Sequence, residues 1–254
     1  MVMRESSMPN TAKAYIALIF ASGTAILVLA AKSWSSPNLP AFSAFLGLTL
    51  FASILKVRIP GFTGNISPNF VFLLIGMAAF RFPEVIAASL AAALLQSMWR
   101  PKQSLRLVQV VFNAATLVSS SAVAYGISHV AVRQIGMISS LAVILLAGSF
   151  YVPLNTALVS LVVSLVERKP LRQVCQQCYE WVFPYFLVGI LLTGLVGAAS
   201  QSKSAAWQDS LLLLPAVVLA YLYFLRRFGH APARASKLEE PSEEELLAVP
   251  SNRR

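Results

Sequence analysis

The chain of 254 residues is 57% hydrophobic and only 12% charged, with a mean hydropathy of +0.70. A soluble domain carries about 25% charged residues, so this composition excludes an ordinary soluble fold. The net charge of +10 would suit nucleic acid, but no basic stripe alternates with aromatic residues as single-strand binders require. In so apolar a chain, cationic side chains instead mark topology and contact anionic lipid. We therefore expect an integral membrane protein that does not bind nucleic acid.

Apolar runs between charged residues divide the chain into eight segments. A helix needs about 20 apolar residues to cross the hydrocarbon core of a bilayer. The first run is expected to be a retained helix, because it is longer than the apolar part of a usual signal peptide. The third run is short, and we expect it either to form a hairpin of half-depth helices with the fourth or to begin before Asn69. The segments are Ala14–Ala31, Pro40–Leu55, Asn69–Phe80, Pro83–Trp99, Leu107–Ile127, Ile138–Val166, Pro184–Ala199 and Trp207–Leu225.

The basic residues indicate how these segments thread the membrane, because cytoplasmic loops accumulate Lys and Arg. With a cytoplasmic N-terminus, sixteen of the 20 Lys and Arg residues lie on the cytoplasmic side. The other four lie one in each outer loop: Lys32, Arg81, Arg133 and Lys203. A miscounted segment would spoil this alternation. The distribution therefore predicts eight crossings with both termini in the cytoplasm.

The sequence divides into three parts: a cytoplasmic segment (residues 1–13), a transmembrane helical domain (14–227) and a cytoplasmic tail (228–254). The tail contains three prolines, an acidic cluster and few residues to bury, so we expect it to be disordered. The predicted fold is all-α, a polytopic bundle of transmembrane helices. The sequence leaves the oligomeric state open.

Residues that carry enzyme chemistry are scarce. The chain has two histidines, His129 and His230, which lie far apart in the sequence. Cys175 and Cys178 form a C-x-x-C pair in a predicted inner loop, without the second ligand pair that zinc requires or a thioredoxin-like unit. No nucleophile elbow and no carboxylate pair within a segment is present. We expect no catalytic residues, no metal and no cofactor, and hence no enzymatic activity.

Five polar residues are the candidates for ligand binding or helix packing. Arg81 and Glu84 are three residues apart at the turn between the third and fourth segments, where they form either a surface ion pair or, through Arg81, a contact to an anionic ligand. Asn113 and Thr116 lie in the fifth segment and Asn155 in the sixth. They either form hydrogen bonds between helices or line a ligand cavity. A short loop joins these two segments, so we expect both amides inside the bundle, hydrogen-bonded, at depths that allow them to meet.

Four motifs occur in a familiar order along the chain. They are Ile66-Ser67-Pro68-Asn69-Phe70-Val71-Phe72, Phe82-Pro83, Val111-Phe112-Asn113-Ala114-Ala115 and Val152-Pro153-Leu154-Asn155-Thr156. Over residues 10 to 227 this order resembles bacterial MASE-type membrane-associated sensor domains. Those domains usually precede a cytoplasmic HD-type phosphohydrolase, GGDEF or kinase module. This sequence ends instead in a short acidic tail, so the resemblance implies a sensor that acts through a separate partner.

Two functions follow from these patterns. The first is a non-enzymatic, sensor-like module that acts through a separate cytoplasmic signalling protein. The alternative is a small-solute transport component, either a substrate-binding subunit or a small transporter. Transport requires Arg81, Asn113 and Asn155 to converge on a polar cavity that opens to the outside, whereas a sensor can be densely packed. In both cases the expected location is the bacterial cytoplasmic (inner) membrane, with the lipid bilayer as the main partner.

Overall fold

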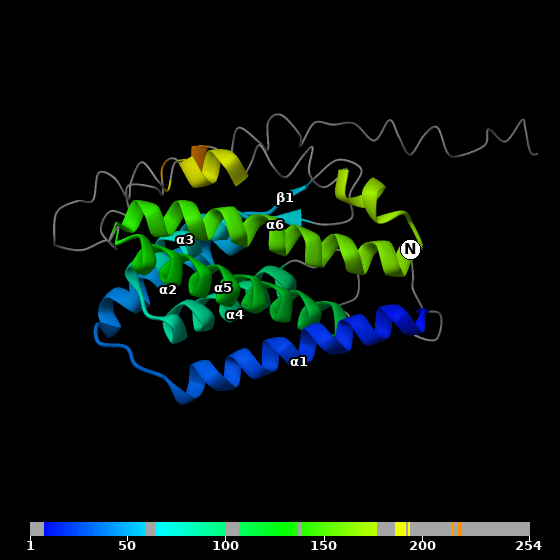
Figure 1. Ribbon diagram of the computed structural model, residues 1–254, viewed down its shortest axis with the longest axis horizontal. Helices are drawn as coiled ribbons and strands as arrows, with labels where there is room; N and C mark the ends of the chain where they lie inside the picture. Colours follow the sequence, from blue (N-terminus) through cyan, green and yellow to red (C-terminus); the bar gives the residue numbers. More distant parts are fainter. Residues whose placement is uncertain are drawn as a thin grey trace, which may run out of the picture.

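The structure is a computed structural model that describes residues 8–58, 65–99, 107–136, 139–176, 186–191, 193, 215 and 218–219. Within these ranges the fold is a bundle of helices whose long axes run broadly along one direction (Figure 1). The labelled helices are α1 (Asn10–Lys32), α2 (Leu39–Ile54), α3 (Asn69–Ala79), α4 (Phe82–Met98), α5 (Leu107–Ile135) and α6 (Ser140–Glu167). Residues 171–176 and 186–191 are also helical. A minimal antiparallel ladder of β1 (Val57–Arg58) and β2 (Asn65–Ile66) connects α2 to α3.

The first six predicted segments are confirmed as helices, but two of their ends differ by several residues. α1 begins at Asn10, four residues before the predicted Ala14. α5 does not end with its apolar run at Ile127 but continues through His129 to Ile135. The run stops where the composition becomes polar, whereas a helix stops where its backbone conformation changes. That change occurs at Gly136, whose positive φ of 72° is a conformation that favours glycine after a helix. The seventh and eighth segments and the tail lie largely outside the described residues.

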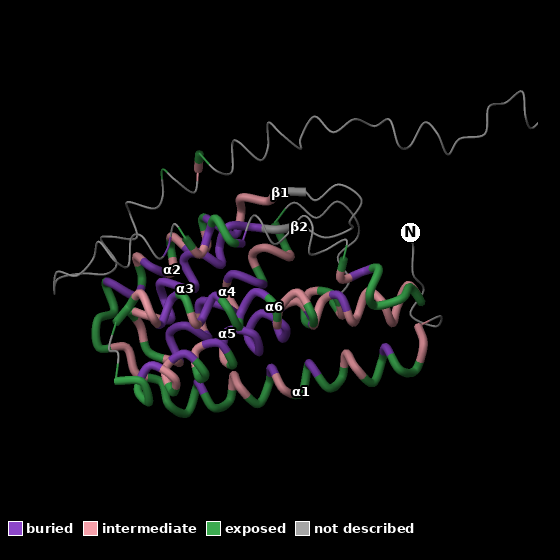
Figure 2. Tube along the Cα trace, turned by 45° about the horizontal axis from the view of Figure 1, so that its top comes forward, coloured by how far each residue is buried: buried purple, intermediate pink, exposed green. Residues whose placement is uncertain are grey.

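Three of the described helices are long and apolar enough to cross a membrane: α1, α5 and α6, with 23, 29 and 28 residues. The helices α2, α3 and α4 are apolar but shorter. Much of α1 is exposed (Figure 2). Its exposed residues include Leu18, Phe20 and Leu29, which have large apolar side chains. Such a surface suits hydrocarbon rather than water. These features identify a multi-pass membrane protein that associates with the lipid bilayer.

The short helix α3 lies at the centre of the bundle. Nine consecutive residues of α3, from Asn69 to Met77, are buried, and the helix contacts α2, α4 and α6. The third predicted segment therefore begins at Asn69, not earlier, because β2 precedes it in an extended conformation. At 1.5 Å per residue its 11 residues extend about 16 Å. This is about half of the roughly 30 Å hydrocarbon core, so α3 is a core helix that other helices surround.

Close backbone approaches hold neighbouring helices together. Gly23 of α1 faces Ala115 of α5, and a Cβ atom at Gly23 would lie 2.8 Å from the Ala115 Cβ. Gly189, in the helical residues 186–191, faces the ring of Phe70 on α3. Glycine permits both contacts because it has no side chain, and such small residues are typical of helix interfaces in membranes.

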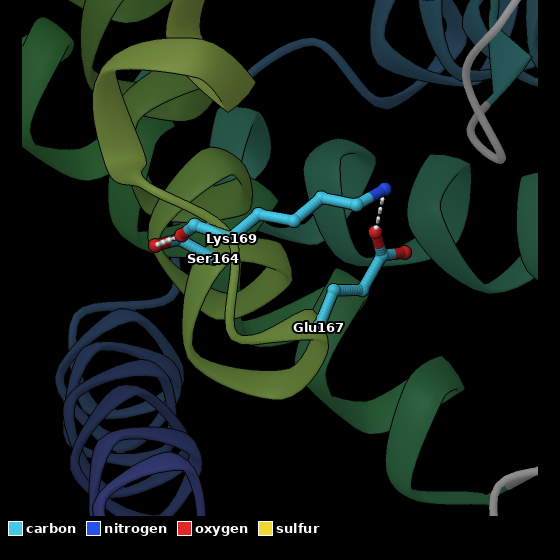
Figure 3. A network of polar contacts seen from close by, with 3 residues as sticks. All are labelled: Ser164, Glu167 and Lys169. Carbon is cyan, nitrogen blue, oxygen red and sulfur yellow. Dashed lines mark hydrogen bonds and ion pairs between the residues drawn. The ribbon is translucent and has the colours of Figure 1, made fainter.

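The end of α6 is fixed by local polar contacts. Arg168 adopts a left-handed conformation (φ 54°) that turns the chain away from the helix axis. The Ser164 hydroxyl then donates to the Lys169 carbonyl at 2.7 Å, and Lys169 Nζ lies 2.7 Å from Glu167 Oε2 (Figure 3). Pro153 lies inside α6, which remains helical on both sides of it.

Candidate functional site

The buried carboxylate of Glu84 accepts hydrogen bonds from two connections between helices at one end of the bundle. Glu84, in the first turn of α4, is 2% exposed. Its Oε1 accepts a hydrogen bond from the Ser36 hydroxyl at 2.7 Å, and its Oε2 accepts one from the Arg81 backbone N–H at 2.8 Å. We call Ser36, Arg81 and Glu84 the Glu84 cap. It ties the α1–α2 connection to the α3–α4 turn.

The predicted surface ion pair between Arg81 and Glu84 is wrong. The carboxylate is buried and takes the Arg81 backbone N–H, while the exposed guanidinium donates from Nη1 to Ser35 Oγ at 2.6 Å. A glutamate at the third helical position accepts the N-cap amide in a capping box, and the positive N-terminal end of the helix dipole favours its charge. Sequence spacing indicated the proximity of the two residues but not which donor of Arg81 would be used.

A neutral polar cluster lies at the other end of α4. Asn69 is 4% exposed, and its Nδ2 donates to Ser53 Oγ at 3.3 Å and to Gln96 Oε1 at 3.4 Å. We call Ser53, Asn69 and Gln96 the Asn69 cluster, and it connects α2, α3 and α4. Nearby, Lys56 donates from Nζ to the Trp99 carbonyl, and burial lowers the pKa of Lys56.

The two predicted amides of α5 and α6 do not pair with each other. Asn113 is half-buried, and its Nδ2 donates to Ser97 Oγ of α4 at 2.9 Å. Asn155 is half-buried and has no side-chain hydrogen bond to another described residue. The expectation that both amides are hydrogen-bonded is therefore wrong for Asn155. Thr116, one turn beyond Asn113, is fully buried, and its hydroxyl has no hydrogen-bond partner among the described residues.

The candidate residues thus separate into groups along the bundle. Arg81 and Glu84 lie at the start of α4, whereas Asn113 contacts Ser97 near its end. The sixteen residues from Arg81 to Ser97 correspond to about 24 Å of helix. Arg81 and Asn113 consequently cannot contact one small ligand at the same time.

The polar contacts at these positions are hydrogen bonds and ring stacking. Within the described ranges, no three His, Cys, Asp or Glu side chains gather as a metal site would require. Cys175 is a half-buried free thiol, and Cys178 lies outside the described residues. His129 stacks on Tyr125 with 4.0 Å between ring centroids and contacts the Tyr125 carbonyl. These contacts stabilise the last turns of α5.

Four residues of the Glu84 cap and the Asn69 cluster were not among the sequence candidates: Ser36, Ser53, Asn69 and Gln96. Ser36 lies in the connection between α1 and α2, where a serine ordinarily contacts solvent or its own backbone. Asn69 is the first residue of α3, directly after the N-cap residue Pro68, and an asparagine there ordinarily contacts nearby backbone. Each instead bonds to a residue distant in sequence, and no local pattern indicates such a partner.

No family model matches the chain, and no curated protein or solved structure shows significant similarity to it.

Proposed function

We propose that this chain is a non-enzymatic, sensor-like module of a bacterial cytoplasmic membrane that acts through a separate signalling protein. The observation that carries the proposal is the distance between two candidate residues. Arg81 lies at the start of α4, whereas Asn113 of α5 contacts Ser97 near the end of α4. A transport component would need these residues to converge on one cavity. Their separation favours a densely packed module that responds to a stimulus at one end and contacts its signalling protein at the other.

The connections of α4 support this assignment. The Glu84 cap fixes one end of α4 to the α1–α2 connection, and the Asn69 cluster fixes the other end to α2 and α3. A change that displaces the Glu84 cap would therefore act on a helix that reaches the opposite end of the bundle. The motif order shared with MASE-type domains, eight crossings and two cytoplasmic termini belong to the same proposal.

A transport component is the second candidate, and one observation favours it. Thr116 and Asn155 carry polar groups without a partner among the described residues. Polar groups inside a membrane domain are frequent at substrate sites of transporters. This reading uses α5 and α6 and leaves the Glu84 cap with a purely structural role.

Transport and partner binding can be tested with the same protein. Proteoliposomes that contain the purified protein are assayed for uptake of labelled vitamins, amino acids and inorganic anions, with protein-free vesicles as the control. In parallel, a photo-crosslinking residue is placed in intact cells at Gln103 or Leu171, in the predicted cytoplasmic loops, and at Ser35 as the control. The sensor proposal expects no specific uptake and a crosslink to one signalling protein from the two loops only. Specific uptake of any solute, or no loop-specific crosslink to a signalling protein, would overturn it.

A further inference from the structure

Two hydroxyl groups in the middle of α5 are buried without a hydrogen bond. Thr116 and Ser120 are both 0% exposed, and neither hydroxyl oxygen has a hydrogen-bond partner in the part of the chain that the structure describes. Several other buried hydroxyls bond to the carbonyl four residues earlier, as Thr49 and Ser89 do at 2.9 and 2.8 Å, whereas those of Ser67 and Ser160 are also unpaired among the described residues. A buried polar group is rarely left unpaired. The two unpaired hydroxyls, which lie one turn apart on α5, therefore indicate a place for a bound partner.

The contacts of Tyr15 in α1 indicate which residues of α5 and α6 lie at the same depth in the bundle. The ring of Tyr15 lies 6.1 Å from that of Phe112, and its hydroxyl donates to the Leu158 carbonyl at 3.0 Å. Phe112 of α5 and Leu158 of α6 thus lie at similar depth. Because the two helices are antiparallel, Thr116 and Asn155 lie about 6 and 4.5 Å from that level in the same direction.

The next helical turn of α5 and that of α6 also lie at similar depth. Ser120 and Tyr151 lie about 12 and 10.5 Å from the level of Phe112. Thr116 and Ser120 follow Phe112 at spacings of four, so they share its face of α5. Asn155 follows Tyr151 by four residues and shares its face of α6, and Tyr151 is 1% exposed within the core. No hydrogen bond of the Asn155 or Tyr151 side chain is present among the described residues.

We propose that Thr116, Ser120 and Asn155 bind ordered water in an internal site between α5 and α6, with Tyr151 at its border. The lining offers hydroxyl and amide groups, which match an uncharged ligand that both donates and accepts hydrogen bonds. Water does both, and it is small enough for two helices in direct contact. Pro153 lies at the same level and removes one backbone hydrogen bond from α6. The proposal does not depend on the sensor assignment.

The first test is whether a nearly isosteric substitution raises or lowers the melting midpoint of the protein. If Thr116 binds water, Thr116→Val should lower the melting midpoint of the detergent-solubilised protein by about 2–4 °C. If the hydroxyl is truly unpaired, the same change removes an unsatisfied group and should leave the midpoint unchanged or raise it. Ser149→Ala is the matched control, because that hydroxyl is exposed and bonds to the Leu145 carbonyl, and it should have no effect. An unchanged or raised midpoint for Thr116→Val would overturn the proposal.

A second test detects water directly and does not depend on stability. Brief X-ray radiolysis generates hydroxyl radicals from bound water, and these radicals oxidise adjacent aromatic rings. Tyr151 should be oxidised in the wild-type protein, whereas Phe45, which is equally buried, should not. Asn155→Leu should reduce the oxidation of Tyr151 several-fold and leave Phe45 unchanged. Equal, background-level oxidation of Tyr151 and Phe45 in the wild-type protein would contradict a hydrated site.

Discussion

Glu84 is an almost completely buried carboxylate in the first turn of α4. Its two hydrogen-bond donors, the Ser36 hydroxyl and the Arg81 amide, come from different turns of the chain. Removal of the carboxylate would break both hydrogen bonds and leave the α1–α2 connection without its tie to the start of α4.

We predict that Glu84→Ala lowers the free energy of unfolding by about 1–3 kcal/mol, because two hydrogen bonds to a carboxylate are lost. Glu84→Gln keeps one acceptor oxygen and should cost less. Arg81→Ala removes only the exposed contact to Ser35 and should cost under about 1 kcal/mol. The measurement is the midpoint of SDS-induced unfolding in mixed micelles. Equal losses for the three variants would show that the Glu84 cap has no special role.

Asn113 allows a cleaner measurement, because it has one defined side-chain partner, Ser97. We predict that Asn113→Leu and Ser97→Ala are non-additive in a double-mutant cycle, with a coupling energy of about 0.6 kcal/mol, as for other hydrogen bonds between membrane helices. Asn155→Leu combined with Ser97→Ala is the control pair and should be additive. Additivity for Asn113 and Ser97 would mean that their hydrogen bond contributes no stability.

At the scale of elements, the contact between α1 and α5 depends on a glycine. An added methyl group at Gly23 would meet the Cα and Cβ atoms of Ala115 at 2.9 and 2.8 Å. Those atoms belong to or adjoin the backbone, so they cannot rotate away. The whole of α1 would have to move outward.

We predict that Gly23→Ala lowers the free energy of unfolding by about 1–3 kcal/mol through overpacking. Gly126→Ala is the matched control, since a Cβ atom there meets nothing within 4 Å. Alanine is the better helix former by about 0.5–1 kcal/mol, so that variant should be as stable as the wild type or more so. Thermal unfolding followed by circular dichroism measures both. A neutral Gly23→Ala would indicate that α1 is loosely attached.

At the scale of the whole molecule, the main prediction is the membrane topology, that is, which loops lie on which side of the membrane. The distribution of Lys and Arg places residues 103 and 171 in the cytoplasm and residue 35 outside. In a background with Cys175→Ser and Cys178→Ser, single cysteines at these positions should react accordingly with a membrane-impermeant maleimide on intact cells. Only the cysteine at position 35 should be labelled before lysis. External labelling at 103 or 171 would require a different number of crossings.

Several features of this protein were determined by the sequence alone. The apolar runs predicted six of the observed helices because hydrophobicity and length suffice to specify a helix in hydrocarbon, where every backbone group must bond internally. The ends were less certain, as α5 shows, because His129 and Arg133 are polar yet compatible with helical backbone. The proximity of Arg81 and Glu84 also followed from spacing, because residues three apart at a helix start are neighbours.

Only the tertiary structure decided which polar groups meet. Asn69 bonds to Ser53 and Gln96, and Ser36 bonds to Glu84, across separations of 16, 27 and 48 residues. Local patterns carry no information about such pairs, because each depends on how helices pack around α3. The same packing moved Glu84 from an expected surface position into the interior and left Asn155 without the amide partner that depth alone had indicated. Depth along a helix can be counted from sequence, but the direction in which a side chain points relative to its neighbours is set by the assembled bundle.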